Sequence, residues 1–296
     1  MNACASCVSC IIAKAEKRLE KYKDYQKNDE YMHCLLKILY DHAQTESAPW
    51  LSTKATALFE EFFGEQKDFT EIKHMYNQLM LSKEKQVEER IRCSQDPLVT
   101  GILYACAGNY IDFGTMLNVN SDVLMELLDK VDTQKISEKV VTQFRAELAT
   151  AKELVYLTDN CGEIVMDKIF IRYLKELYPK LHVTIIVRGA NALNDATMED
   201  AKETGLVDVA DCIGNGTAYP GTVLHEISEE ARNCIKNADV IISKGQGNFE
   251  SLYKNGTNPY YMFLCKCDLF VKRFGLEKFS PVVMKEEHIK GEDHIW

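Results

Sequence analysis

The stretch LVYLTDNCGE at residues 154–163 decides the fold of this chain. An apolar, β-rich run is followed at once by two oxygen ligands, Asp159 and Asn160, and then by Gly162. Because an amphipathic segment begins directly afterwards, the pattern predicts a strand, a tight turn and the start of a helix. Such a turn brings oxygen ligands and the free N–H groups of a helix N-terminus to one point, which suits a metal ion together with a phosphate group.

The chain after residue 153 alternates between short apolar runs and helical segments. This alternation predicts a parallel sheet covered on both faces, in which ligands bind beyond the carboxyl ends of the strands. The predicted strands are residues 154–158, 182–187, 207–213, 240–243, 261–264 and 281–284, and the predicted helices between the first four are 164–178, 198–204 and 223–237.

The first half of the chain carries apolar residues at helical spacing, with no alternation typical of strands. Asp96 and Pro97 are an N-cap and a first-turn proline, and Ser121 is a second expected N-cap. We therefore predict the class α/β, with an α-helical domain over 1–150, a three-layer α/β/α domain with a mainly parallel sheet over 151–285, and a charged tail over 286–296. The predicted helices of the first half are residues 11–25, 31–43, 52–63, 69–92, a segment from 97, 122–131 and 136–152.

Composition excludes several classes of protein. The 296 residues carry 45 acidic and 35 basic side chains, a formal net charge of -10 without a basic stripe, so we expect no nucleic acid and no membrane as partner. The sequence has no apolar run of about 18 residues, so a membrane span is not expected. The first ten residues lack the basic segment of a signal peptide, so a secretory signal is not expected either.

The 11 cysteines are an odd number in a chain of this length. They favour a reduced, cytoplasmic protein over a disulfide framework. Oligomeric state cannot be read from these features.

Carboxylate and amide oxygens follow the first two predicted strands. Asp159 and Asn160 are hard ligands suited to Mg²⁺ or Mn²⁺, and Asp195 is placed to reach the same ion from the neighbouring loop. The alternative is that Asp159 and Asp195 cap the helices that follow them.

Lys244 ends the predicted strand at 240–243, where its ammonium can point into the same edge of the sheet and bind a phosphate oxygen. Gly245 and the following glycine allow close backbone approach, and we place Asn248 and Glu250 at the next helix start. The alternative is a flexible surface turn with a solvated lysine.

Three further motifs carry polar or thiol groups. In residues 108–114, Asn109 and Asp112 either satisfy local backbone groups or lean over the cleft and touch substrate. In the glycine-rich stretch 214–222, the last residue is expected to cap the next helix. The thiols of Cys4, Cys7 and Cys10 cover one helix face, so a second metal shared by them, completed from a distance by Cys265 and Cys267, is one interpretation. Buried thiols without a metal are at least as compatible with the pattern.

These motifs, in this order and at these separations, resemble the family called domain of unknown function 89, also described as damage-control phosphatases or as the acidic-residue methyltransferase-like family. The resemblance covers nearly the whole chain, up to about residue 285, and Cys4-x-x-Cys7 is similar to the mark of its mostly prokaryotic branch. The matching segments are residues 108–114, 159–163, 194–197, 220–222 and 244–250.

The resemblance implies a helical N-terminal part, an α/β/α C-terminal part, and a metal-dependent phosphatase of small phosphorylated metabolites. By match of motif, the metal ligands are Asp159, Asn160 and Asp195, the residues that meet the phosphate are Lys244 and Asn248, and those near substrate are Asn109 and Asp112. We also assign substrate-binding roles to Glu163, Arg188, Gly245 and Glu250 and catalytic roles to Asp159, Asp195 and Lys244.

Two other functions compete with phosphomonoester hydrolysis. A non-catalytic sensor of phosphorylated metabolites would bind the same ligands without turnover. A carboxyl methyltransferase would need an adenosylmethionine loop, and no glycine-rich loop follows the first strand. The ligand set favours Mg²⁺ or Mn²⁺, while Co²⁺ or Ni²⁺ would bind tightly if available. The substrate itself is not determined by these motifs.

Overall fold

The structure, a computed structural model, describes residues 1–64, 68–112 and 119–289. Residues 113 and 114 of the 108–114 motif, and most of the predicted tail, lie outside these ranges. The sheet has six strands in the order β3-β2-β1-β4-β5-β6, with β1 to β5 parallel and β6 antiparallel to β5. The strands are β1 (Glu153–Leu157), β2 (His182–Val187), β3 (Asp211–Gly214), β4 (Val240–Lys244), β5 (Tyr260–Leu264) and β6 (Pro281–Lys285).

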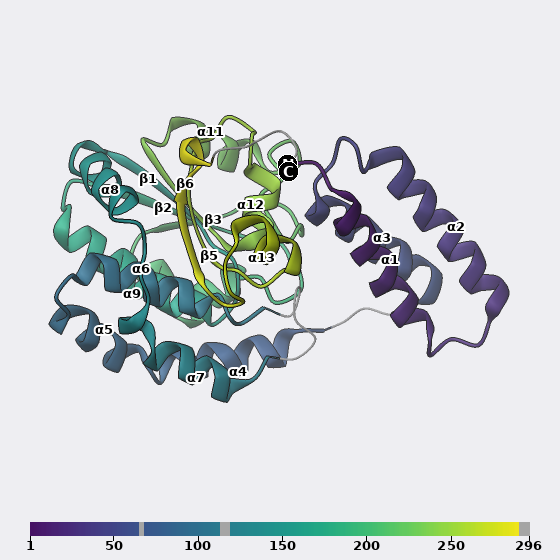
Figure 1. Cartoon of the computed structure of the whole chain (residues 1–296), viewed down its shortest axis with the longest axis horizontal. Helices are drawn as coiled ribbons and strands as arrows, with labels where there is room; N and C mark the ends of the chain where they lie inside the picture. The colour runs from purple at the N-terminus through teal and green to yellow at the C-terminus, as the bar shows by residue number, and fades with distance from the viewer. Residues whose placement is uncertain (65–67, 113–118, 290–296) are drawn as a thin grey trace.

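Side chains on each strand alternate between two apolar cores, one on each face of the sheet. On β1, Leu154 and Tyr156 enter one core while Val155 and Leu157 enter the other, as the period of two requires. The first core is covered by α6 (Pro97–Gly108), α8 (Glu138–Thr150) and α9 (Glu163–Leu177) and the second by α11 (Glu229–Asn237), α12 (Gly245–Leu252) and α13 (Asp268–Phe274). The predicted three-layer α/β/α architecture is therefore confirmed (Figure 1).

Most predicted elements form, with shifted ends, but the segment 69–92 is two helices rather than one. The chain breaks at Ser82, whose hydroxyl donates to the carbonyl of Leu79 at 2.6 Å and so competes with the helical pattern. Both halves pack against α9, and the second half also packs against α6. The remaining helices are α1 (Ala5–Leu19), α2 (Tyr25–His42), α3 (Ala48–Phe63), α4 (Thr70–Leu81), α5 (Glu84–Cys93), α7 (Ser121–Asp129) and α10 (Met198–Glu203), with 3₁₀ turns η1 (Val131–Thr133), η2 (Leu206–Asp208) and η3 (Glu286–His288).

Two other boundaries correct the sequence interpretation. The strand predicted at 207–213 begins only at Asp211, because Gly205 adopts a left-handed conformation and leads into the turn η2. The helix predicted at 223–237 begins at Glu229, where the side chain of Ser228 caps the N–H of Ala231. Thr222 is therefore not its cap, and its hydroxyl lies 2.8 Å from the side-chain oxygen of Asn248.

Helices α1 to α3 form a core of their own, which Figure 1 shows to one side of the sheet-containing body. Helices α4 to α9, by contrast, share one apolar core with the sheet. Side chains from before and after residue 150 belong to that core. The domain boundary predicted at residue 150 stays a prediction. No helix within the described ranges combines the length and the apolar character needed to cross a membrane.

Candidate active site at the carboxyl edge of the sheet

The candidate site lies beyond the carboxyl ends of β1, β2 and β4. The strand order reverses between β1 and β4, and ligands in open α/β sheets bind at such a reversal. Asp159 follows β1, Arg188 follows β2 and Lys244 ends β4. The fold therefore brings together side chains that are far apart in sequence.

The loops after β1 and β2 are joined by backbone hydrogen bonds. The N–H of Cys161 lies 2.8 Å from the carbonyl of Asn194, and the N–H of Ala196 lies 2.7 Å from the carbonyl of Asp159. This pairing sets Asn160 opposite Asp195 in an antiparallel bridge. The two loops thus hold the three predicted metal ligands at one place.

Asp159 is buried and accepts hydrogen bonds from two amides. Its Oδ2 lies 2.9 Å from Nδ2 of Asn109 and 2.7 Å from Nδ2 of Asn160, while its Oδ1 lies 3.6 Å from Nη2 of Arg188. The N-cap of α9 is Gly162, without a side-chain cap. Helix capping, the alternative role for Asp159, is therefore wrong.

Asp195 is paired with Arg188 rather than with a helix end. Nε of Arg188 lies 2.7 Å from Oδ2 of Asp195, and both side chains are buried. Helix α10 is capped instead by Thr197 and Asp200 in a capping box. Capping by Asp195 is therefore also wrong.

Glu163, at the first position of α9, is a hub of this network. Its Oε2 lies 2.8 Å from Nδ2 of Asn109 and 3.0 Å from Nδ2 of Asn160, and its Oε1 lies 2.6 Å from Nζ of Lys244. The carboxylate thereby connects the predicted metal ligands to the lysine of β4.

Lys244 is fully buried, so it is not a solvated surface lysine. Its Nζ lies 3.0 Å from the carbonyl of Ala105 and 2.6 Å from carboxylate oxygens of both Glu163 and Asp167. These three acceptors match the three protons of an ammonium group. The arrangement differs from the sequence expectation of an ammonium open to the cleft. Burial lowers the pKa of Lys244, but Asp167 and Glu163 outweigh it and raise that pKa.

Helix α12 begins at Gly245, so Asn248 and Glu250 lie within it rather than at its start. Nδ2 of Asn248 donates to the carbonyls of Thr158, at 2.9 Å, and of Lys244, at 2.7 Å, which fixes the ends of β1 and β4. Burial raises the pKa of Glu250 to about 7, against the charges of the N-terminal amine and Lys14. The charges that act on the Glu250 carboxyl include those of the N-terminal amine, of Lys14 in α1 and of Asp112.

Gly245 has a positive φ of 79° and no room for a side chain. A Cβ atom there would lie 2.0 Å from Oδ2 of Asp159. The group that comes close to the backbone of Gly245 is therefore the carboxylate of Asp159, a predicted metal ligand.

Negative charge exceeds positive charge at the site. Burial raises the pKa of Asp159 well above its ordinary value, and Asp195, Glu163 and Asp112 raise it further. Burial likewise raises the pKa of Asp195 to about 6, opposed by Arg188. When all of them are ionised, the five buried carboxyl groups of the site outnumber its three buried cations and leave an excess of two negative charges. The carboxyl groups are Asp112, Asp159, Glu163, Asp167 and Asp195, and the cations are Arg188, Lys244 and Lys266.

A divalent cation would balance this excess, and the donor set of two carboxylates and one amide suits a hard ion. Among the described residues, no group of three or more His, Cys, Asp and Glu is arranged to hold a metal. A metal here would therefore depend on the amide oxygen of Asn160 beside Asp159 and Asp195. We conclude that these residues fit such an ion.

Two residues of the site were missed by the sequence interpretation. Lys266 is buried, with Nζ 2.6 Å from the carbonyl of Asn109 and 2.5 Å from Oδ2 of Asp112. It follows β5 much as Lys244 ends β4, and this position was the available signal. Asp167 lies four residues after Glu163 on α9, where it reads as an ordinary polar position of an amphipathic helix.

The three N-terminal cysteines do not assemble a metal centre in the described part of the chain. Sγ of Cys4 and Sγ of Cys7 lie 3.6 Å apart, while Cys10 is exposed. The structure gives no support to the second metal considered from sequence.

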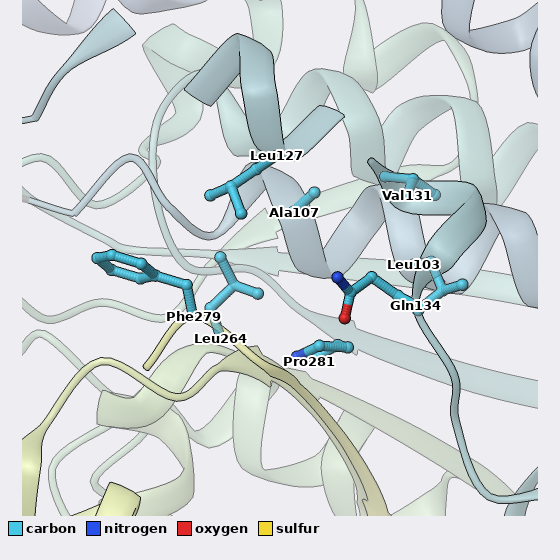
Figure 2. Close-up of a pocket in the computed structure, with 8 residues that line it drawn as sticks. All are labelled: Leu103, Ala107, Leu127, Val131, Gln134, Leu264, Phe279 and Pro281. Carbon is cyan, nitrogen blue, oxygen red and sulfur yellow. The ribbon is translucent and has the colours of Figure 1, made fainter. Parts of the chain in front are cut away.

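The cavity in Figure 2 is not a substrate site. Its volume is about 20 Å³, which is room for about one water molecule, and its lining is mostly apolar. It lies between α6, the η1 region and the end of β5, and its lining residues are Leu103, Ala107, Leu127, Val131, Gln134, Leu264, Phe279 and Pro281.

Comparison with known proteins agrees with this architecture. The model of the family described as the damage-control phosphatase ARMT1-like domain matches residues 3–282. The chain is 27% identical to a damage-control phosphatase of Archaeoglobus fulgidus, over 91% of this chain and 94% of that protein. It is 26% identical to a damage-control phosphatase of Pyrococcus horikoshii, over 95% of this chain and 97% of that protein.

An uncharacterized protein of Methanocaldococcus jannaschii is 28% identical over 94% of each chain. Among solved structures, the crystal structure of a DUF89 family protein from Pyrococcus horikoshii superposes with a TM-score of 0.77 at 26% identity. The superposition covers 97% of this chain and 99% of the Pyrococcus horikoshii chain. The family model and the two relatives named damage-control phosphatases support a phosphatase-type activity.

Proposed function

Because the chain belongs to the damage-control phosphatase ARMT1-like family, we propose that it is a metal-dependent phosphatase that hydrolyses small phosphorylated metabolites. The observation that carries the proposal is the buried excess of carboxylates around Asp159 and Asp195, at the reversal of strand order. A divalent cation is the natural complement of such a site, and the bound cation would in turn attract a phosphorylated substrate.

Asp159, Asn160 and Asp195 would hold the metal, whether Mg²⁺, Mn²⁺, Co²⁺ or Ni²⁺. When bound, such an ion polarises a phosphoryl oxygen and offsets the charge of the reacting group. The amides of Asn109 and Asn160 restrain the carboxylate of Asp159, and Nε of Arg188 restrains that of Asp195. The chain therefore orients its ligands before any substrate arrives.

Arg188 is the residue best placed to meet the phosphoryl group directly. Nη2 of its guanidinium is buried and has no hydrogen-bond acceptor among the described residues. That nitrogen lies 3.6 Å from Oδ1 of Asp159, next to the proposed metal ligands. A phosphoryl oxygen would complete its hydrogen bonding, and arginine suits phosphate by its fork of donors.

Lys244 acts in this proposal by holding Glu163 and Asp167 and by contributing positive charge near the substrate. Its three protons are already shared among oxygens at 2.6 to 3.0 Å. Gly245 and Asn248 bring the start of α12 to the same edge, where backbone N–H groups favour an anion. Such preorganised charge is worth about 3–4 kcal/mol of transition-state stabilisation per donor.

Asn109 and Asp112 are proposed to border the substrate from the end of α6, with Lys266 as the counter-ion of Asp112. Glu250 remains a proposed substrate residue only through the family motif, because the N-terminal amine and Lys14 of α1 lead the charges that act on its carboxyl. Substrate identity would be set by the residues that surround this edge.

The test is phosphate release from a panel of sugar phosphates and an aryl phosphate, run in parallel with EDTA, Mg²⁺, Mn²⁺, Co²⁺ and Ni²⁺. We expect release that depends on metal and that falls at least about 10²-fold in Asp159→Asn, because the variant removes one ligand charge. The matched control is Asp132→Asn, at an exposed aspartate of η1, which should keep full activity. Equal turnover in Asp159→Asn and the wild type would refute the proposal.

A further inference from the structure

Two thiols meet at the start of α1. Cys4 is the N-cap residue of this helix and Cys7 lies in its first turn, with their Sγ atoms 3.6 Å apart. Cys4 is partly accessible, whereas Cys7 is buried. The pair therefore offers one sulfur to solvent and keeps the other behind it.

We propose that Cys4 and Cys7 are a redox-active dithiol that closes to a disulfide by exchange with a small-molecule disulfide. The bond requires the two sulfurs to approach from 3.6 Å to about 2.05 Å, a shift within reach of side-chain rotation. The two sulfurs are not among the residues of the acidic network, although the charge of the proposed substrate residue Glu250 acts on Cys7. The inference does not depend on the phosphatase proposal.

The two thiols differ in the way that such an exchange requires. Burial opposes ionisation of Cys4, but the polar groups of the first turn, which are the backbone N–H and thiol of Cys7 and the N–H of Ser6, outweigh it and lower the pKa of Cys4. Burial, followed by the charge of Glu250, raises the pKa of Cys7. Thiolates at helix N-termini in C-x-x-C motifs are the reactive ones, so Cys4 is the attacking sulfur and Cys7 the resolving one.

The exchange proceeds in two balanced steps. The thiolate of Cys4 attacks one sulfur of the small disulfide, forms a mixed disulfide and releases the first small thiolate. Cys7 then loses its proton and attacks Sγ of Cys4, which releases the second small thiolate. The two protein thiols are oxidised by two electrons, and the small disulfide is reduced to two thiols.

A third cysteine in the next turn of α1 provides a matched control. Cys10 lies three residues beyond Cys7 and is exposed, so it tests whether accessibility alone directs the exchange. The charge of Cys10 is among the causes that raise the pKa of Cys267, so Cys10 and Cys267 are the competing pair that the experiment must distinguish.

The experiment treats the full chain with oxidised glutathione, blocks free thiols with an alkylating agent and maps the peptides by mass spectrometry. We expect a Cys4–Cys7 disulfide that dithiothreitol reverses, and its retention in Cys10→Ser. In Cys7→Ser, glutathione should stay attached to Cys4, because no resolving thiol remains. In Cys4→Ser, Cys7 should remain unmodified.

Three results would overturn the proposal. One is a wild-type chain in which Cys4 and Cys7 stay alkylated as free thiols after oxidation. Another is a disulfide between Cys10 and Cys267 in place of the expected one. The third is glutathione attached to Cys10 but not to Cys4 in Cys7→Ser. Because the peptide map of the oxidised wild-type chain can by itself overturn the proposal, the test does not depend on the folding of any variant.

Discussion

At the scale of single residues, Gly245 tests how closely α12 must approach Asp159. We expect Gly245→Ala to lose phosphatase activity, because its Cβ would lie 2.0 Å from Oδ2 of Asp159 and displace that carboxylate. The control is Gly256→Ala, which has a similar φ of 77° but nothing within 4 Å of the added atom. Gly256→Ala should lose about 1 kcal/mol of stability from backbone strain, and Gly245→Ala should lose more because of the clash with Asp159. Equal activity in the two variants, measured by phosphate release, would show that the contact with Asp159 does not matter.

Lys244 makes a second prediction about single residues. Lys244→Met leaves Glu163 and Asp167 buried without their shared cation, and breaking a buried pair costs about 3–5 kcal/mol. We expect the free energy of unfolding in urea to fall by an amount of this size. Lys278→Met, at an exposed lysine, serves as the control. A change below about 1 kcal/mol in Lys244→Met would contradict the buried ion network.

The residues after β1, β2 and β4 could be predicted because parallel strands bring their carboxyl ends to one edge. The orientation of Lys244 could not, since its partner Asp167 is marked by no motif and lies on a neighbouring helix. Lys266 could not be singled out although it follows a predicted strand, because a single lysine between two cysteines belongs to no motif. A residue's place after a strand end therefore predicts that it belongs to the site. It does not predict which partner its side chain binds.

At the scale of elements, His182 joins the starts of β1, β2 and β3. Its ring nitrogens lie 2.7 Å from Glu153 and 2.9 Å from Asp211, and these bonds, that of Glu153 first, raise the pKa of His182. Because the pKa of His182 is higher in the folded protein, its protonation stabilises the fold. This stabilisation is complete below the unfolded-state pKa of about 6.5 and is lost as the pH rises through the folded-state pKa. Because the ring is half exposed, we expect only about 0.2–1 kcal/mol.

The measurement is the difference in unfolding free energy between the wild type and His182→Asn at pH 5.5 and at pH 8.5. The difference should be larger at pH 5.5, and it should shrink in high salt because the bonded groups are exposed. His33→Asn, at an exposed histidine of α2, should show no such trend. A difference that grows toward pH 8.5 would have the wrong sign for this account.

Element boundaries followed the sequence where caps and apolar periods agreed, as at Asp96, whose side chain caps α6. They failed where a local side-chain bond competed with the period, as at Ser82, and where the cap lay later than expected, as at Ser228. The period of apolar residues is preserved across such breaks because both pieces pack against the same body.

At the scale of the whole molecule, α1 to α3 have an apolar core that is distinct from the two cores of the sheet, and α3 packs against α12. Tyr219 and Val223 enter their core, and Nε1 of Trp50 lies 2.9 Å from Oε1 of Glu226. We expect this unit to unfold at a lower denaturant concentration than the sheet. In a Trp296→Phe background, Trp50 is the sole tryptophan, since the chain has 2.

The fluorescence midpoint of Trp50 in urea should therefore fall below the midpoint of far-UV circular dichroism, which reports all helices and strands. Tyr219→Ala should lower the fluorescence midpoint further, because it removes a side chain from the shared core. Coincident midpoints in both proteins would mean that the chain unfolds as one unit.

The most direct test of the central claim is equilibrium binding of Mn²⁺ to the folded chain without substrate. The account predicts one site in the wild type and in Asp132→Asn, and its loss in both Asp159→Asn and Asp195→Asn, with all four proteins folded by circular dichroism. Mn²⁺ bound equally well by Asp159→Asn and Asp195→Asn would contradict the assignment of the carboxylate excess to a metal site.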